Sequence, residues 1–288
     1  MKKKKEIGLK VKNFLIIFFA LSFFSFPADE KIGFLLKGNE YNLSLIKSGI
    51  LKCICKTEFS PEALEERENP VKEYTYFVKF KGENYYEEEI TVDKNGKKYG
   101  RITAYNGECT KVIDFEIDDN GKYINMTGAI YPDNQEFPFC PQLYSIVKRF
   151  LALMQRAKYK KFKGKKIIEG IETYEIEIET QYTRENFFVD YNHGYYLKKA
   201  ISTFKNKKYP GAIWKIEKLK KFGEIWFPVK ATRVFYSNGK MYQKDYIEVK
   251  EIQFNSEIPD STFTIQFPEG LLVWDGITKR SFIVGSKK

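Results

Sequence analysis

Alternating apolar and polar residues dominate this chain and predict antiparallel β-strands over most of its length. The pattern is clearest from Ile225 to Val284, which predicts consecutive antiparallel strands closed by turns. Asn238-Gly239 predicts a tight hairpin, because both central residues of such a turn tolerate positive φ. Pro228 predicts an edge strand or a bulge, since proline has no N–H for the ladder. The strands predicted here are Ile225–Phe235, Gln243–Phe254, Thr262–Phe267 and Leu271–Asp275.

The N-terminal part repeats the pattern. Ile50–Phe59 and Tyr74–Phe80 each place apolar side chains on one face. Asn-Gly pairs at positions 95–96, 106–107 and 120–121 are spaced as a meander requires, and Cys109–Ile117 is one of its strands. Further along, Thr173–Thr180 sets Tyr174, Ile176 and Ile178 against three glutamates.

Two segments have helical spacing instead. A short helix is expected within Ile32–Ile46, and a long helix is expected over Pro141–Lys158, whose apolar residues recur at steps of three and four. In addition, Pro61 after Ser60 is a helix start signal and favours a single helical turn. The predicted fold is mainly β: one curved antiparallel sheet forming an open, incomplete barrel, with the long helix over its concave face. Residues 29–288 form a single domain in this prediction.

Four stretches of the second half resemble the periplasmic LolA/LolB-like lipoprotein-carrier superfamily. They are FFVD..HGYYLKKA (Phe187–Ala200), GEIWFPVKATRV (Gly223–Val234), FNSEIPDSTFTIQFPEG (Phe254–Gly270) and the closing VWDGITKRSFIVG. The resemblance implies an unclosed antiparallel barrel wrapped over helices, with an apolar concave face that holds acyl chains. These are strand and turn signatures, so no individual lipid-contacting residue is carried over.

The N-terminus predicts export. Lys2–Lys5, Lys10 and Lys12 form a basic region, and the apolar run Phe14–Phe26 suits a signal peptide better than a membrane span. Residues 1–28 are therefore expected to be a signal peptide or an uncleaved N-terminal anchor. Of the net charge of +11, these residues supply six Lys against Glu6, or +5, which leaves +6. Nucleic acid is not expected as a partner, because this remaining charge is Lys interleaved with Glu.

Shape and resemblance together predict a periplasmic or cell-envelope binding protein, and possible carriage of its ligand. The expected partners are a lipid or an acylated protein and an envelope membrane protein; the chain is expected to be a monomer without cofactor and without enzyme activity. The residues expected to line the ligand site are Phe150, Leu151, Met154, Tyr174, Ile176 and Ile178. An equally weighted alternative is that these side chains only pack in the core.

Two other classes of function stay open. The first is a structural or interaction module of the envelope with a filled core, which recruits a partner by adding a strand to its exposed edge. The second is a hydrolase that uses carboxylates. The chain has 38 acidic residues, so the sequence does not single out a catalytic pair. His193, the one histidine, lies in a turn three residues after Asp190, where local turn chemistry accounts for both.

Four cysteines in an exported chain predict disulfides. Cys53 and Cys55 lie on the same face of one strand, so each is expected to pair with Cys109 or Cys140 rather than with the other. A four-cysteine zinc site and free buried thiols are the alternatives.

Overall fold

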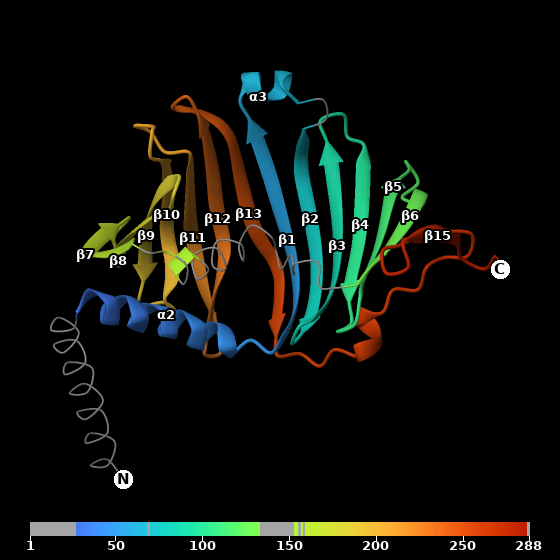
Figure 1. Ribbon diagram of the computed structural model, residues 1–288, viewed down its shortest axis with the longest axis horizontal. Coiled ribbons are helices and arrows are strands. Elements are labelled where there is room, and N and C mark those ends of the chain that lie inside the picture. The colour runs from blue at the N-terminus through green and yellow to red at the C-terminus, as the bar shows by residue number, and fades with distance from the viewer. Residues whose placement is uncertain (1–26, 68–69, 133–152, 155–156, 158, 287–288) are drawn as a thin grey trace, which may run out of the picture.

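We describe a computed structural model, in which residues 27–67, 70–132, 153–154, 157 and 159–286 are placed. These residues form a single sheet of 15 strands (Figure 1). The strands are β1 (Ser48–Phe59), β2 (Val71–Lys81), β3 (Asn84–Asp93), β4 (Lys98–Tyr105), β5 (Thr110–Ile117), β6 (Tyr123–Tyr131), β7 (Tyr159–Ile168), β8 (Ile171–Glu179), β9 (Thr183–Asp190), β10 (Tyr196–Phe204), β11 (Ala212–Phe222), β12 (Ile225–Ser237), β13 (Lys240–Phe254), β14 (Leu272–Asp275) and β15 (Arg280–Ile283).

Two meanders make up this sheet. In space the strands follow the order β15-β14-β6-β5-β4-β3-β2-β1-β13-β12-β11-β10-β9-β8-β7, so the antiparallel β1/β13 ladder joins the two halves. Strands β7 and β15 are the two edges and do not pair with each other, which leaves the sheet unclosed. The predicted fold class, a mainly β and mostly antiparallel open sheet, is confirmed.

The turn chemistry of the sequence accounts for much of this connectivity. Asn238 and Gly239 both have positive φ, 50° and 77°, as the predicted hairpin between β12 and β13 requires. Pro228 lies in β12, an interior strand, at a place where the β11/β12 register shifts between Lys218 and Leu219. Pro228 was predicted to lie in an edge strand or at a bulge, and it lies at a bulge.

The end of the chain differs from the prediction of consecutive antiparallel strands. No strand covers Thr262–Phe267; a 3₁₀ turn, η1 (Asp260–Phe263), is followed by unpaired chain. Strand β14 crosses to the far edge of the sheet and pairs in parallel with β6. Phe263 and Ile265 are buried in this segment although it is not a strand, because burial does not require a backbone partner.

The predicted short helix is confirmed as α2 (Ala28–Ser44), and the single turn as α3 (Pro61–Glu65), where the Ser60 hydroxyl accepts from Ala63 N–H at 3.2 Å. Figure 1 shows α2 running across the lower ends of the strands in the left half of the sheet. The Asn39 amide donates to the Tyr195 carbonyl at 3.0 Å. Asn42 donates to the Trp226 carbonyl and accepts from its N–H, both at 2.9 Å, which ties α2 to two strand ends.

The predicted long helix, Pro141–Lys158, lies almost entirely outside the described residues, as do residues 1–26. Within it, Leu153 and Met154 are helical, and Ala157 N–H donates to the Leu153 carbonyl at 2.8 Å, one helical turn apart. In the described part of the chain, no helix is both long enough and apolar enough to cross a bilayer.

The two faces of the sheet differ in chemistry. We call the face that packs against α2 the inner face; in β1 it carries Leu51, Cys53 and Cys55. The opposite, outer face carries exposed ion pairs between neighbouring strands, except over β4–β6, where the C-terminal segment covers it with Ile265, Leu271 and Val273. The outer pairs include Lys52–Glu251, Lys56–Glu73 and Lys230–Glu248.

The lysine-rich segment after Lys158 is the edge strand β7. Lys163 and Lys165 lie near Glu177 and Glu172, at 3.4 and 2.8 Å. Lysines on an edge strand discourage pairing with another chain, so those of β7 protect this edge of the sheet.

Candidate functional site

The inner face over strands β8–β11 is an apolar surface. Because the strands pair in register, Ile176 lies beside Phe187 of β9, which lies beside Ala200 of β10 and then Trp214 of β11. Ile32 and Leu35 of α2 pack onto the same cluster. The cluster consists of Ile32, Leu35, Met154, Tyr174, Ile176, Ile178, Phe187, Val189, Leu197, Ala200, Ala212 and Trp214.

Four of the six predicted lining residues fall within this cluster. Tyr174, Ile176 and Ile178 point to the inner face of β8, and Met154 packs with them. All four are buried, Ile176, Ile178 and Met154 completely. Phe150 and Leu151 lie outside the described residues. The structure brings the four together, while their role in ligand binding stays a prediction.

A second apolar cluster continues the inner face across the centre of the sheet. It includes Leu51 of β1, Val78 of β2 and Ile247 of β13, and Leu43 of α2 packs against it. The apolar lining thus continues from β8 through β13 and β1 to β2, across the register shifts in the β9/β10, β11/β12, β12/β13 and β1/β13 ladders.

One buried ion pair sits within this lining, near the ends of the central strands. Asp245 of β13 accepts from Arg233 Nε at 2.7 Å and Nη2 at 2.6 Å, and from Thr57 Oγ1 and Gln243 Nε2, both at 2.9 Å. Its side chain is 1% exposed. These bonds join β1, β12 and β13 at the seam between the two meanders, and they satisfy the buried carboxylate.

Beyond β2 the inner face becomes polar. Glu87 and Glu89 of β3 project onto it, with Arg101 of β4 beside Glu89 in register. Glu87 is 4% exposed, and its Oε2 atom has no hydrogen-bond partner in the part of the chain that the structure describes. Burial, and then the charge of Glu89, raise the pKa of Glu87 to about 9; Arg101 acts in the opposite direction. Burial likewise raises the pKa of Glu89.

The sequence contained a weak signal for these two carboxyls. In NYYEEEITVD, Tyr85, Glu87 and Glu89 share one face of the strand. Three consecutive glutamates conceal the alternation, because both faces then look equally polar. The burial of Glu87 is set by its long-range neighbours and has no local signature.

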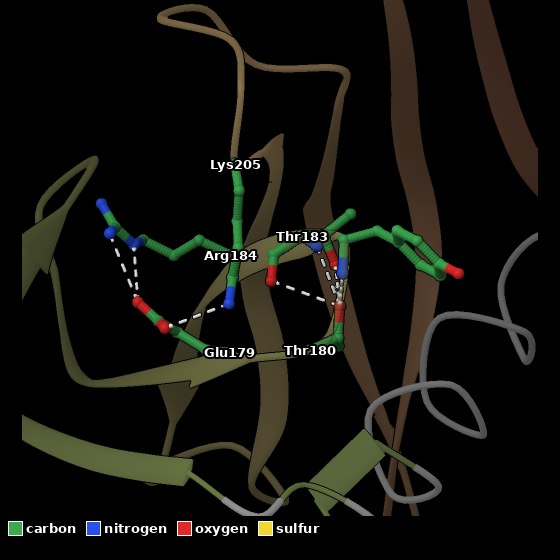
Figure 2. A network of polar contacts seen from close by, with 6 residues as sticks. Glu179, Thr180, Thr183, Arg184 and Lys205 are labelled. Carbon is green, nitrogen blue, oxygen red and sulfur yellow. Dashed lines mark hydrogen bonds and ion pairs between the residues drawn. The ribbon is translucent and has the colours of Figure 1, made fainter.

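The β8–β9 turn, at one end of the apolar lining, is fixed by side-chain contacts (Figure 2). The Thr180 hydroxyl accepts from Thr183 N–H at 2.9 Å and lies 2.8 Å from the Thr183 hydroxyl. Glu179 lies 3.3 Å from both Lys205 and Arg184. The hydrogen bond from Lys205 is the main cause that lowers the pKa of Glu179.

His193 and Asp190, which the sequence analysis assigned to local turn chemistry, do contact each other. His193 Nδ1 lies 2.8 Å from Asp190 Oδ2, and Asp190 is fully buried. They line a cavity of about 360 Å³ with Lys198 and Trp226. None of the described residues lining this cavity is a Ser, Thr or Cys.

The predicted disulfides stay a prediction. Cys53 and Cys109 are free thiols here, so no bond joins these two, and Cys140 lies outside the described residues. Cys53 and Cys55 are buried side by side on the inner face, as predicted from alternation. Within the described ranges, no three His, Cys, Asp or Glu side chains are grouped so that they could hold a metal ion.

No protein-family model matches this chain, and no curated protein matches it. Solved structures do match. A DUF1329 family protein from Desulfovibrio piger is 13% identical over 79% of this chain and 96% of its own, with a TM-score of 0.48. A putative outer membrane lipoprotein-sorting protein domain from Vibrio parahaemolyticus is 8% identical over 79% and 95%, with a TM-score of 0.44.

A LolA superfamily protein from Nitrosomonas europaea is 10% identical over 80% of this chain and 96% of its own, with a TM-score of 0.42. At these identities and TM-scores the likenesses say nothing about what this chain binds. The chemistry of its own inner face has to carry that inference.

Proposed function

We propose that this chain is an exported cell-envelope protein that binds a lipid, or the acyl chains of an acylated protein, on its inner face, and that it acts as a carrier rather than as an enzyme. The observation that supports this proposal is the difference between the two faces. Apart from Glu185 and the Arg233–Asp245 pair, the inner face is apolar from β8 to β2, whereas the outer face of the same strands carries exposed ion pairs. The predicted export signal and the sequence resemblance are in line with it.

The energetics of such binding are those of apolar burial. Each methylene group transferred from water to the inner face contributes about 0.8 kcal/mol. The lining residues of β8 are themselves buried under α2 and Met154. Acyl chains would therefore enter by displacing part of that cover, and ligand would compete with the protein's own packing.

Displacement of a fluorescent fatty-acid analogue tests the proposal. Ile176→Glu places a charge within the buried lining, and we expect it to weaken binding by at least about tenfold. Ile167→Glu is the matched control: Ile167 lies in the adjacent β7 and is 75% exposed. Thermal melting of each variant shows whether it folds, and Tyr174→Ser serves as the milder variant. Equal binding by wild type and both lining variants would contradict the proposal.

One observation favours the alternative, an interaction module that adds a partner's strand to the sheet. The edge strand β15 and its neighbour β14 expose large apolar residues, whereas the other edge, β7, carries five lysines. On β14 and β15, Leu272 is 51% exposed, Trp274 42%, Phe282 40% and Ile283 50%. An exposed edge that carries large apolar residues and a single charged residue, Arg280, is open to pairing with an extended segment of a partner.

A photo-crosslinking amino acid at position 282, in cells that produce the protein, tests this alternative. The same amino acid at position 182, where Tyr182 is 69% exposed at a distant turn, is the control. A discrete protein adduct from position 282 alone, with no lipid bound to the purified protein, would favour the interaction module. No adduct from either position would count against it.

A further inference from the structure

The inner face has a polar end with an excess of negative charge. Strands β3, β4 and β5 place Glu89, Arg101 and Asp114 side by side in register, and Glu87 lies in the adjoining row of β3. Three carboxyl groups thus share one guanidinium. Arg101 is already engaged by Asp114, at 2.6 Å from Nε and 3.2 Å from Nη2. No cation from the described residues remains for Glu87.

Glu87 is the group whose environment is incomplete. It is 96% shielded from solvent, given its 4% exposure, and its Oε2 atom has no hydrogen-bond partner within the described chain. An unpaired carboxyl in such a place is costly, and its proton is retained to avoid a buried charge. The titratable groups that face it are Tyr76, Tyr85, Glu89, Arg101 and Asp114.

The surroundings favour an organic cation over other ligands. An anion would meet three carboxyl groups, and the described residues do not form a group able to hold a metal ion. Aromatic rings flank the site instead: Tyr76 stacks on Tyr74, and Tyr85 lies against Tyr105, each with centroids 6.1 Å apart. Tyrosine rings attract ammonium groups through the negative face of the ring.

The polar end also has access to solvent. The side chains of Arg101 and Asp114 are 57% and 47% exposed, so the inner face opens beside Glu89. On the other side of Glu87, Val78 and Leu51 begin the apolar lining. A molecule with a charged head and an apolar tail would fit here, with its head at the polar end and its tail on the apolar lining.

We propose that Glu87 and Glu89 bind the protonated amine of an amphiphile whose apolar chain lies on the neighbouring lining. This proposal rests on the proposed function, because it names the head group of the ligand that the apolar face would hold. The bound ammonium group supplies the missing cation, so Glu87 ionises on binding and releases its proton to solvent. The carboxylate then accepts a charge-assisted hydrogen bond from the amine.

Titration calorimetry with decylamine and decanol tests the head-group assignment, because the two probes differ in charge and share the apolar chain. Near neutral pH we expect decylamine to bind at least about tenfold more tightly than decanol. Repeating the titration in two buffers of different ionisation enthalpy measures the protons released, and we expect about one per decylamine bound.

Glu87→Gln should abolish both the preference for decylamine and the proton release, and leave the affinity for decanol unchanged. Glu88→Gln is the matched control: Glu88 is the next residue on β3 and points to the outer face, where it accepts from Tyr123 Oη at 2.9 Å. This variant should behave as wild type.

The outcomes separate the two proposals. Equal binding of both probes, or decylamine binding that Glu87→Gln does not change, would overturn the amine site and leave apolar binding standing. If neither probe binds, the proposed function and the amine site are both wrong. Tighter binding of decylamine with proton release, lost in Glu87→Gln alone, supports the site.

Discussion

Two buried carboxyl groups on the inner face show how differently a folded chain can treat the same chemistry. Asp245 is 1% exposed and accepts hydrogen bonds from Arg233, Thr57 and Gln243. Glu87 is nearly as buried and lacks such partners among the described residues. Asp245 therefore stabilises the seam of the sheet as an ion, whereas Glu87 is a destabilising group whenever it is ionised.

The stability of the protein should depend on pH through Glu87. Its pKa is raised from 4.5 to about 9 in the native state. In the pH range between these values the unfolded chain releases the proton that the native state retains, so stability falls as pH rises. We expect Glu87→Gln to be more stable than wild type by about 2 kcal/mol near pH 8, and similar to it near pH 5.

Thermal melting of both proteins across this pH range measures the effect, with Glu88→Gln as the control. Parallel curves for wild type and Glu87→Gln would show that Glu87 titrates normally in the folded state.

Removal of the Asp245 carboxylate should destabilise the protein, whereas neutralising Glu87 should stabilise it. Asp245→Ala leaves Arg233 without its partner, and we expect it to cost about 3–5 kcal/mol of unfolding free energy. Lys52→Ala is the comparison, since Lys52 pairs with Glu251 at 3.6 Å on the exposed outer face and should cost less than about 1 kcal/mol. Urea denaturation measures both. Similar small costs for the two variants would mean that the buried pair adds nothing to the seam.

At the scale of elements, α2 is docked by a close approach of its backbone to the sheet. A Cβ atom added at Gly38 would lie 2.4 Å from Cδ2 of Tyr195, whereas one added at Gly33 would meet nothing within 4 Å. Both glycines are in α2, so alanine changes the helix propensity at each position, but only at Gly38 does the added Cβ atom meet the sheet.

We therefore expect Gly33→Ala to stabilise the protein by about 0.5–1 kcal/mol through helix propensity alone. Gly38→Ala should destabilise it by about 1–3 kcal/mol, because Tyr195 or the helix has to move. Thermal melting compares the two variants. Stabilisation by Gly38→Ala as well would show that α2 is not held against Tyr195 as described.

The elements also show what the sequence could and could not predict. Asn238-Gly239 and its counterparts encode their hairpins locally, so the meanders and the face of Tyr174, Ile176 and Ile178 were predictable. The parallel pairing of β14 with β6 joins residues more than a hundred positions apart, and no local pattern encodes it. Glu87 was missed for the same reason, since its burial depends on other strands.

At the scale of the whole molecule, the sheet is one surface with two environments. Its inner face is mainly apolar from β8 to β2, where Glu185 and the Arg233–Asp245 pair interrupt it, and polar over β3–β5; the outer face is charged or covered by the C-terminal segment. A filled core would use such an apolar face only for packing, whereas a carrier would open it to a ligand.

Native mass spectrometry of the protein, purified without detergent and followed by organic extraction, decides between these two uses of the inner face. We expect adducts in the mass range of lipids, lost on extraction and restored by incubation with phospholipid or acylated peptide. A clean mass for the polypeptide alone, unchanged by that incubation, would mean that the inner face is filled by its own side chains and would contradict the carrier proposal.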